Sequence, residues 1–440
     1  MRRRIPSEFL LCFGVMFPMR YPGLAWGLGL VVAITAFAAD WPQYRGPASD
    51  GSSPERGTLK KWPSEGPRQL WKRPLQLGFS SFAVAGGKAF TLEQRYLDGA
   101  SQEVCLALDA NTGKELWTFP LGLARYDNGY DAGPDDGPRS TPAVSAGKVY
   151  VTSALLRLVC LDADSGKVVW SKDLMKENAG RNILWQNAAS PLIDGDLLFV
   201  AGGGPGQALL GIDKQSGKVV WKGENDRITH ASPIAATILG QRQIIFFTQS
   251  GLVSVQPQDG KVLWRYNFPY RTSTAASPVV AGDIVYCSAA YGVGAGAARI
   301  SKDGDQWKAT ELWRKPGNAL CNHWSTPVAR DSYIYGVFGS KQYKTGPLKC
   351  IEAATGKEVW SQPGFGPGNL ITFDGQLLVL TDYGDLVLAE ASPSGYTELT
   401  RTHAVDGKCW SSPAISNGHI FARSSKEGVC LDVSSQTVRR

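Results

Sequence analysis

One sequence pattern recurs along most of this 440-residue chain and constrains its fold more than any other feature. The most complete copies are LALDANTGKELW, ending at Trp117, and LDADSGKVVW, ending at Trp170. Each copy is typical of a strand, a tight turn at the glycine and a second strand. The tryptophans that close the copies, complete or degenerate, lie 43 to 53 residues apart: Trp71, Trp117, Trp170, Trp221, Trp264, Trp313 and Trp360. Strand-rich repeats of this length predict a β-propeller.

A second signal, Ser-Pro or Thr-Pro followed by an apolar strand, opens most of the repeats. Proline is tolerated there because the first residue of a strand need not donate to the sheet. With the tryptophan turn, this signal divides a unit into four strands, which we name A to D in chain order. The units begin near Ser81, Thr141, Ser190, Ser232, Ser277, Thr326, Leu370 and Ser412, so we predict eight blades.

The two ends of the repeat region complement each other. The last unit contains strands A to C, through Asp432, and lacks strand D, whereas Leu70-Trp71 forms a spare strand before the first unit. Pairing the spare strand with the last unit would remove two exposed sheet edges. We therefore predict an all-β, eight-bladed propeller with four antiparallel strands per blade, closed by the N-terminal strand.

The seven repeat tryptophans are predicted to be structural. We expect each one to insert between its own blade and the next, near the glycine of a Thr-Gly-Lys turn, and to act by packing alone.

The cysteines have a similar structural interpretation. Cys160, Cys350 and Cys430 occupy one equivalent position in separate blades, so they cannot meet and are expected to be small buried residues. Cys321 and Cys409 lie in equivalent loops, and a disulfide between them is the alternative.

The composition agrees with a turn-rich β protein and argues against nucleic acid as a partner. The chain has 50 glycines and 26 prolines, which suits short strands joined by tight turns. Its formal charge is +7, of which +3 lies in residues 1–39. Because lysine and arginine form no block in the sequence, we expect no binding to nucleic acid.

The N-terminal region is typical of an export signal. An apolar run over residues 23–37 ends in Ala36-Phe37-Ala38, a small-x-small cleavage pattern. We predict a signal peptide region at 1–39, a lead-in segment at 40–68, a single propeller at 69–433 and a tail at 434–440. The mature protein is then periplasmic or secreted, has no membrane span, and is expected to be a monomer. An uncleaved membrane anchor and a start at Met16 or Met19 remain alternatives.

The repeat resembles the tryptophan-docking repeat of the pyrroloquinoline-quinone (PQQ) quinoprotein propellers, and it does so over roughly residues 40–433. The opening DWPQYRGP, from Asp40 to Pro47, also resembles the lead-in of bacterial PQQ-repeat proteins. The resemblance implies the fold directly. For activity it implies two classes, because the same propeller serves quinoprotein alcohol dehydrogenases and the propeller lipoprotein of the outer-membrane assembly machinery.

The resemblance also implies what an enzyme of this family would carry. Quinoprotein alcohol dehydrogenases hold PQQ between a tryptophan and a disulfide of adjacent cysteines, with a bound calcium ion and an aspartate as base. This sequence has no adjacent cysteine pair and no C-x-x-C-H haem signature. Both cofactors, PQQ and calcium, therefore remain open for this chain.

Candidate ligand-binding residues lie in the loops that lead into strand A and in the loops between strands B and C. In a closed ring these loops converge on one face, around one mouth of the channel. The side chains there that carry a ring or a positive charge are Arg139, Trp185, His230, Arg271, His323, Trp324, Trp410 and Arg423. They would suit a flat anionic ligand or a sugar. Alternatively, they fill the channel and cap the ends of the blades.

One acidic loop is a weak candidate for calcium. Its oxygen-bearing side chains are those of Asp127, Asn128, Asp131, Asp135 and Asp136. Their spacing differs from the EF-hand pattern, and a solvated acidic loop is the alternative.

Two functional hypotheses follow. The first is a non-catalytic binding or assembly scaffold whose partner is a protein or a small molecule. The second is a PQQ-dependent dehydrogenase that oxidises an alcohol or a sugar. The sequence contains no complete catalytic constellation, so the scaffold is preferred.

Overall fold

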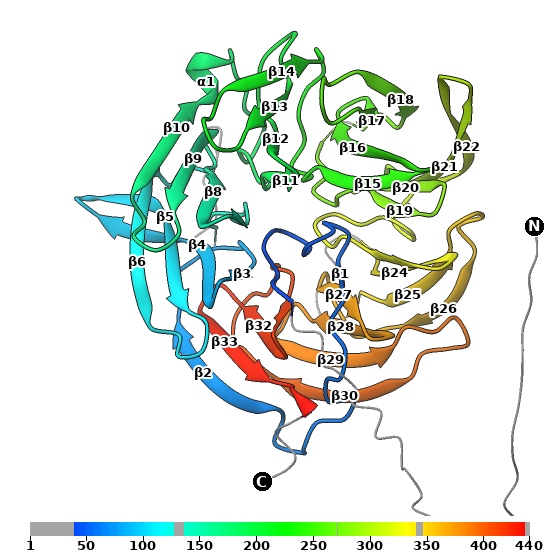
Figure 1. The fold of residues 1–440 in the computed structure, drawn as a ribbon. Coiled ribbons are helices and arrows are strands. Elements are labelled where there is room, and N and C mark those ends of the chain that lie inside the picture. The colour runs from blue at the N-terminus through cyan, green and yellow to red at the C-terminus, as the bar shows by residue number, and fades with distance from the viewer. Residues whose placement is uncertain (1–38, 127–135, 271, 340–345, 436–440) are drawn as a thin grey trace, which may run out of the picture. The chain divides into compact units, whose positions relative to one another are not determined.

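The computed structural model describes residues 39–126, 136–270, 272–339 and 346–435. Within them, eight sheets form a ring, and each contains four antiparallel strands (Figure 1). In seven blades these four strands are consecutive in the sequence, whereas the eighth blade takes its outer strand from the N-terminal part of the chain. The predicted all-β, eight-bladed propeller is confirmed. None of the helices in these residues is long and apolar enough to span a membrane.

The blades follow the chain in order. Blades 1 to 4 consist of β3 (Ala83–Ala85), β4 (Lys88–Leu97), β5 (Ala100–Asp109) and β6 (Glu115–Leu123); β7 (Ala143–Ser145), β8 (Lys148–Thr152), β9 (Arg157–Asp162) and β10 (Val168–Asp173); β11 (Leu192–Asp194), β12 (Leu197–Ala201), β13 (Leu209–Asp213) and β14 (Val219–Gly223); and β15 (Ile234–Ile238), β16 (Gln241–Thr248), β17 (Gly251–Val255) and β18 (Val262–Asn267). The short helix α1 (Leu174–Glu177) follows blade 2.

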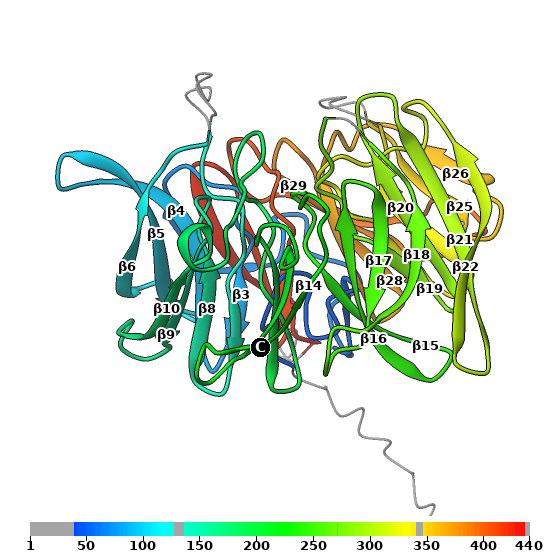
Figure 2. The same cartoon turned by 90° about the horizontal axis from the view of Figure 1, so that it is seen from above.

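Blades 5 to 7 consist of β19 (Val279–Ala281), β20 (Ile284–Ala289), β21 (Gly294–Asp303) and β22 (Gln306–Lys315); β23 (Val328–Arg330), β24 (Tyr333–Val337), β25 (Leu348–Glu352) and β26 (Glu358–Gln362); and β27 (Asn369–Phe373), β28 (Gln376–Leu380), β29 (Asp385–Glu390) and β30 (Glu398–His403). Blade 8 combines β31 (Ala414–Ser416), β32 (His419–Arg423) and β33 (Glu427–Asp432) with β2 (Arg68–Pro74). In blade 1, the long hairpin of β4 and β5 projects beyond the other strands (Figure 2).

The N-terminal strand closes the ring as predicted. β2 pairs antiparallel with β33, and Trp71 lies opposite Cys430. The guanidinium of Arg68 also contacts the carboxylate of Asp432, at 2.8 Å. The N-terminal part of the propeller therefore supplies the outer strand of its last blade.

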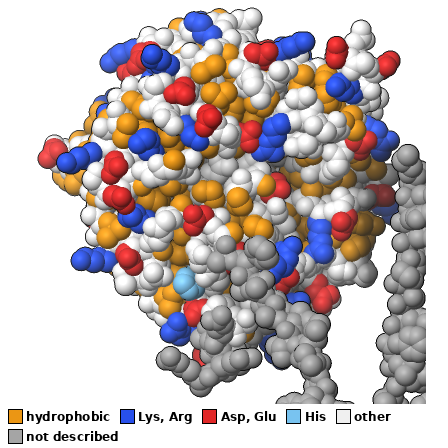
Figure 3. All heavy atoms as spheres, in the orientation of Figure 1, with side chains coloured by type: hydrophobic (Ala, Val, Ile, Leu, Met, Phe, Trp, Pro, Cys, Tyr) orange, Lys and Arg blue, Asp and Glu red, His pale blue; other side chains and the backbone are white. Residues whose placement is uncertain are grey.

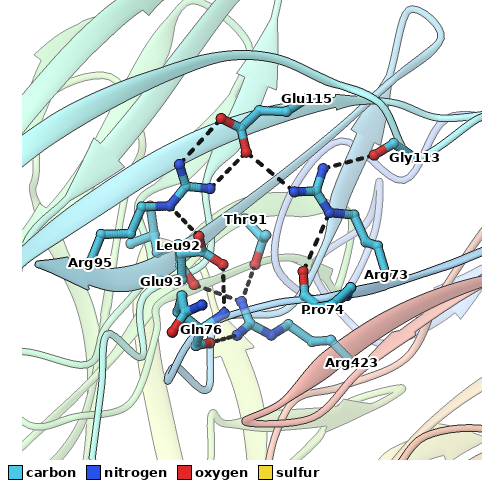
Figure 4. Close-up of polar contacts among 10 residues, drawn as sticks. All are labelled: Arg73, Pro74, Gln76, Thr91, Leu92, Glu93, Arg95, Gly113, Glu115 and Arg423. Carbon is cyan, nitrogen blue, oxygen red and sulfur yellow. Dashed lines mark hydrogen bonds and ion pairs between the residues drawn. The ribbon is translucent and has the colours of Figure 1, made fainter.

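Arg423 ties blade 8 to blade 1 from inside the molecule. Its side chain is fully buried at the end of β32. The guanidinium donates to the carbonyl of Leu92 at 2.6 Å, to the hydroxyl of Thr91 at 2.9 Å and to the carbonyl of Gln76 at 3.0 Å (Figure 4). Because these acceptors belong to blade 1 or to the segment before it, the buried charge is satisfied across the closing seam.

A second group of ion pairs extends this seam toward the surface. Arg95 contacts Glu93 at 2.5 Å and Glu115 at 2.7 Å, and Arg73 of β2 reaches Glu115 at 3.3 Å (Figure 4). Arg73 also donates to the carbonyl of Gly113 at 2.8 Å. The closing strand is therefore held to blade 1 as well as to its own sheet.

The repeat tryptophans dock on the next blade, and they do more than pack. The indole N–H of Trp71 donates to the carbonyl of Ala110 at 2.8 Å, and a Cβ at Gly113 would lie 2.7 Å from the Trp71 ring. The same donation to the following blade occurs for Trp117, Trp170, Trp221, Trp313 and Trp360. The expectation that they act by packing alone is therefore wrong, because six of the seven indoles also donate to a carbonyl of the next blade.

Trp264 departs from the pattern. Its indole donates to Gln243 of its own blade, at 2.7 Å. The next blade carries the long β21–β22 hairpin, which turns at Gly304, in the place where blades 1 to 4 and blade 6 have a Gly-Lys turn. The indole N–H of Trp264 is therefore used within its own blade.

The cysteines behave as predicted from their positions. In the described residues they are Cys105, Cys160, Cys287, Cys321, Cys350, Cys409 and Cys430, and all of them are buried and free. The alternative of a Cys321–Cys409 disulfide is therefore wrong.

The lead-in segment, residues 40–68, crosses the ring (Figure 1). It forms hydrogen bonds with backbone groups at the inner edges of the blades. Short contacts join it to blades 1, 2, 3, 4, 6, 7 and 8 through the pairs Trp41–Val84, Pro42–Val144, Gln43–Ile193, Ser49–Ala235, Arg45–Pro327, Ser52–Thr372 and Glu55–Gly418. One part of it, β1 (Ser52–Ser53), adds a parallel strand to β27. The segment thus supplies partners to backbone groups that the innermost strands would leave unpaired.

The structure explains the residues of the opening motif. Trp41 is 1% exposed, and a Cβ at Gly46, where φ is +81°, would lie 2.6 Å from its ring. Arg45 is 2% exposed and donates to the carbonyls of Thr326 at 2.9 Å and Asp50 at 2.7 Å. The motif therefore encodes a plug for one end of the channel.

The face of the propeller in Figure 3 carries acidic and basic side chains interspersed. A single-sign basic surface is the electrostatic signature of nucleic-acid binding, and this face does not have one.

We expect Trp71→Ala to lower the free energy of unfolding by about 3–5 kcal/mol, because it removes a buried ring at the closing seam. Trp71→Phe should cost about 1 kcal/mol, mainly through the lost hydrogen bond to Ala110. Trp170→Ala should cost less than Trp71→Ala, since Trp170 is only partly buried. Chemical denaturation followed by circular dichroism measures all three. Unfolding of Trp71→Ala together with the wild type would contradict a structural role for this ring.

We expect Arg45→Met to destabilise the propeller by several kcal/mol, because buried carbonyls of blade 6 lose charged donors. Arg56→Met is the matched control on the same segment, since the Arg56 side chain is 53% exposed. Thermal unfolding checks the pair, and equal midpoints would show that the plug does not stabilise the ring.

Candidate functional site

The mouth opposite the plug contains a cavity of about 380 Å³. The loops that lead into strand A surround it, and Tyr44 of the lead-in lies in its lining. Since the lead-in runs along the inner strands, Tyr44 forms a floor and the channel is a cup. The volume lies within the roughly 300–1,000 Å³ of small-molecule sites.

Aromatic rings follow one another around the cavity. Trp410 contacts Phe79 with ring centroids 4.7 Å apart and Trp324 at 4.2 Å, and Trp324 contacts His323 at 4.6 Å. The chain of rings continues to Tyr291 at 5.2 Å. Successive planes on this side are turned by 32° to 83°, so the wall curves around the cavity.

Beyond Tyr291 the wall is flatter. Trp185 and Tyr291 are nearly parallel, at 12°, with centroids 6.5 Å apart. Both residues adopt positive φ, +64° and +59°, which bulky side chains avoid. Backbone strain of this kind persists only where the surrounding structure imposes it, and it concentrates at functional sites.

Arg139 is fixed at the rim by an acidic partner. Its guanidinium donates to both carboxylate oxygens of Asp136, at 2.6 and 2.7 Å, and to the carbonyl of Trp185 at 2.7 Å. The guanidinium carbon also lies 5.3 Å from the ring centre of Tyr126. This bidentate pair orients Arg139 and neutralises its charge.

His230 is buried in the wall with both ring nitrogens engaged. Nε2 donates to the carbonyl of Leu184 at 2.8 Å, so Nδ1 accepts from the hydroxyl of Ser273 at 2.9 Å. Burial, aided by the positive charge of Arg139, lowers the pKa of His230 to about 4. The ring is therefore neutral at physiological pH.

Below the rings, hydroxyl groups form a belt that links the blades. The backbone N–H of Ser412 donates to the hydroxyl of Ser81, that of Ser81 to Thr141, that of Thr141 to Ser190, and that of Ser190 to Ser232. Each distance is 2.8 or 2.9 Å. The Ser-Pro and Thr-Pro signal therefore places a hydroxyl acceptor for the neighbouring blade beside the cavity.

The structure brings most of the predicted mouth residues together. The cavity lining includes Arg139, Trp185, His230, His323, Trp324 and Trp410. Asp136, from the acidic loop, also lines it and is held by Arg139. Whether these residues bind a ligand stays a prediction.

The remaining predicted site residues do not line the cavity or lie outside the described residues. Arg423 does not line the cavity, because it ends strand B of blade 8 and its guanidinium is drawn to blade 1 carbonyls. Arg271 lies outside the described residues. The calcium candidates Asp127, Asn128, Asp131 and Asp135 do so as well.

Sequence reasoning missed several lining residues: Tyr44, Phe79, Tyr291, Lys408 and the hydroxyls of Ser81, Ser190, Ser232 and Ser412. The hydroxyls could have been found, because equivalent positions before strand A must lie on one circle about the axis. Tyr44 could not, since nothing in the lead-in sequence shows that it crosses the channel.

Comparison with known proteins agrees with the fold. The profile of the family described as outer membrane protein assembly factor BamB matches residues 100–336 and 344–437. The chain belongs to this family. The BamB of Moranella endobia is 23% identical over 300 residues, which cover 64% of this chain and 71% of that protein.

Other similar proteins are quinoproteins. The quinoprotein alcohol dehydrogenase PedH of Pseudomonas putida is 31% identical over 135 residues, 29% of this chain and 20% of its own. The solved quinohemoprotein alcohol dehydrogenase of Comamonas testosteroni has a TM-score of 0.62 at 14% identity, covering 90% of this chain and 80% of its own. At that identity the structural match shows a shared fold alone.

We expect the stabilisation due to neutral His230 to be lost in acid. In the unfolded chain the pKa of His230 is near 6.5, so the imidazole is protonated below this pH. In the folded protein the imidazole becomes protonated only near pH 4. The contribution is thus complete above pH 6.5 and disappears as the pH falls through this window. The advantage of the wild type over His230→Gln in free energy of unfolding should shrink by about 3 kcal/mol from about pH 7.5 to about pH 4. A difference that stays constant with pH would contradict a buried neutral imidazole.

Proposed function

We propose that this chain is an exported, non-catalytic binding propeller that acts as a scaffold and captures its ligand in the mouth cavity. The observation that carries the proposal is the cup itself, walled by a chain of aromatic rings and floored by the lead-in. Rigid, partly apolar and concave sites with a few placed polar groups are typical of ligand recognition.

Two ionisable groups of the cup, Asp136 and His230, support binding over catalysis. Asp136 uses both oxygens on Arg139, and His230 uses both ring nitrogens on neighbouring groups. A general acid or base needs a pKa near the working pH and a free approach to the substrate. His230, with a pKa of about 4 and both nitrogens occupied, meets neither requirement.

Membership of the BamB family supports a scaffold with a protein partner, because those relatives are named as assembly factors. The apolar run over residues 23–37 and its cleavage pattern support export to the periplasm or beyond.

The second candidate function is a PQQ-dependent dehydrogenase of alcohols or sugars, and the likeness to PedH favours it. The cup offers rings on which a flat quinone could stack. Among the described residues, no three His, Cys, Asp or Glu side chains are grouped so that they could hold an ion. Among the candidate calcium ligands of the acidic loop, the structure describes Asp136, and its carboxylate is already paired with Arg139.

One experiment separates the two functions. Purified protein is titrated with PQQ and calcium, assayed for dye reduction with alcohols and aldoses, and screened for ligands by thermal shift. We expect at least one ligand, no PQQ-dependent dye reduction, and loss of binding in Trp324→Ala. Trp307→Ala is the control, because Trp307 lies in the β22 strand away from the cavity. PQQ-dependent turnover, or a ligand that Trp324→Ala binds normally, would overturn the proposal.

A further inference from the structure

We propose that Glu55 is the receptor for a new N-terminus, which forms when export removes the segment that ends at Ala38. The α-ammonium group of Ala39 then pairs with the Glu55 carboxylate and fastens the start of the lead-in to blade 8. This inference rests on the export part of the proposed function and is independent of the ligand of the mouth cavity.

Glu55 is a buried carboxylate whose described hydrogen-bond donors are backbone groups. It is 1% exposed, and burial raises its pKa. Its Oε2 accepts from the N–H of Gly418 at 2.8 Å, and its Oε1 accepts from the N–H of Ala39 at 3.3 Å. These two N–H groups and that of Asn417 oppose the rise in pKa, and all three are uncharged. A buried carboxylate is costly in its ionised form unless a cation pairs with it.

Two ionisable side chains adjoin this site in the sequence, and neither supplies the cation. The guanidinium of Arg56 donates to the main-chain carbonyl of Glu55 at 3.0 Å and lies 3.9 Å from the carboxylate of Asp374. His419 begins β32, directly after the turn that contacts Glu55, but burial lowers its pKa, so its imidazole is neutral at physiological pH. The main-chain nitrogen of Ala39 is therefore the group beside the carboxylate that can become charged.

The export signal places a charge on this same nitrogen atom. The apolar run over residues 23–37 ends in Ala36-Phe37-Ala38, and its two small residues predict cleavage after Ala38, one residue before the end of the predicted signal peptide region. An endopeptidase of the export pathway would hydrolyse the bond between Ala38 and Ala39 with one water molecule. Ala38 keeps the new carboxylate, and the amine of Ala39 takes up a proton because α-amino groups have a pKa of about 8.

The sequence pattern and the structure thus identify one atom by independent arguments. Cleavage gives the Ala39 nitrogen three N–H donors and a full positive charge, at a position 3.3 Å from Oε1 of Glu55. Hydrogen bonds that involve charged groups are roughly twice as strong as those between neutral groups. The neutral amide that contacts Glu55 before cleavage becomes its counter-ion afterwards.

Neighbouring contacts hold both partners in place. Trp41, two residues after Ala39, is 1% exposed and exchanges two backbone hydrogen bonds with Val84 of blade 1, at 2.8 and 2.7 Å. The N–H of Glu55 donates to the hydroxyl of Ser53 at 3.2 Å. The ion pair therefore closes a loop of the lead-in across 16 residues and joins it to the turn between β31 and β32.

The test follows the protein from its full-length gene, expressed in a bacterium. Intact mass spectrometry of the exported protein gives its N-terminus, which we expect at Ala39. A second gene carries two glycines inserted between Ala38 and Ala39, so that its product keeps the Ala39 N–H as an amide and carries the ammonium group two residues away. Chemical denaturation should give an unfolding equilibrium constant about tenfold larger for the product with the insertion.

Glu55→Gln tests whether the carboxylate is the partner. The glutamine carbonyl accepts a hydrogen bond but has no charge, so the insertion should change the unfolding constant by less than about twofold in this background. Glu65→Gln is the matched control on the lead-in, because the Glu65 side chain is exposed, and there the tenfold effect should persist. If Glu55→Gln does not fold, the insertion in the wild-type background decides alone.

The outcomes distinguish this inference from the proposed function. An exported protein that keeps residues before Ala39, an N-terminus after Ala39, or equal unfolding with and without the insertion would overturn the inference. These results leave the binding function of the mouth cavity intact, since the ligand screen tests it separately. Retention of the uncleaved chain in the cytoplasm would overturn both the inference and the exported location in the proposed function.

Discussion

The inner edges of the eight blades pose the constraint on which the rest of this structure depends. Strand A of every blade faces the axis with backbone groups that its own sheet pairs on one side only. Two features of the sequence supply hydrogen-bond partners for the backbone groups around these inner edges. The lead-in runs across one end of it, and hydroxyls of Ser and Thr accept N–H groups from blade to blade near the other.

These two features also create the candidate site. A plug at one end turns an open channel into a cup, and the hydroxyl belt places polar groups below a wall of rings. The candidate binding residues are thus side chains added to positions that the fold already needs.

The sequence predicted the fold well and the site in part, for physical reasons. Repeat length and the Gly-turn-Trp pattern report on local hairpins, so blade number and the closure by Trp71 follow from counting. Equivalence of positions around a ring placed Trp324 and Trp410 together correctly. The same argument misplaced Arg423, because a long side chain at a strand end can turn toward either of two neighbouring blades. The plug escaped prediction, since a segment without secondary structure of its own takes its course from tertiary contacts alone.

The closing pair of strands also sets the order in which this molecule can be completed. Arg68 and Asp432 meet although 364 residues separate them, so β2 has no sheet to join until nearly the whole chain has been synthesised. Contacts between such distant segments slow folding, because the entropy of a long loop is lost before the pairing is gained. Until then a row of unpaired backbone groups is exposed to other chains and to proteases. Dependence on chaperones during this interval is therefore a natural property of a ring sealed by its own first strand.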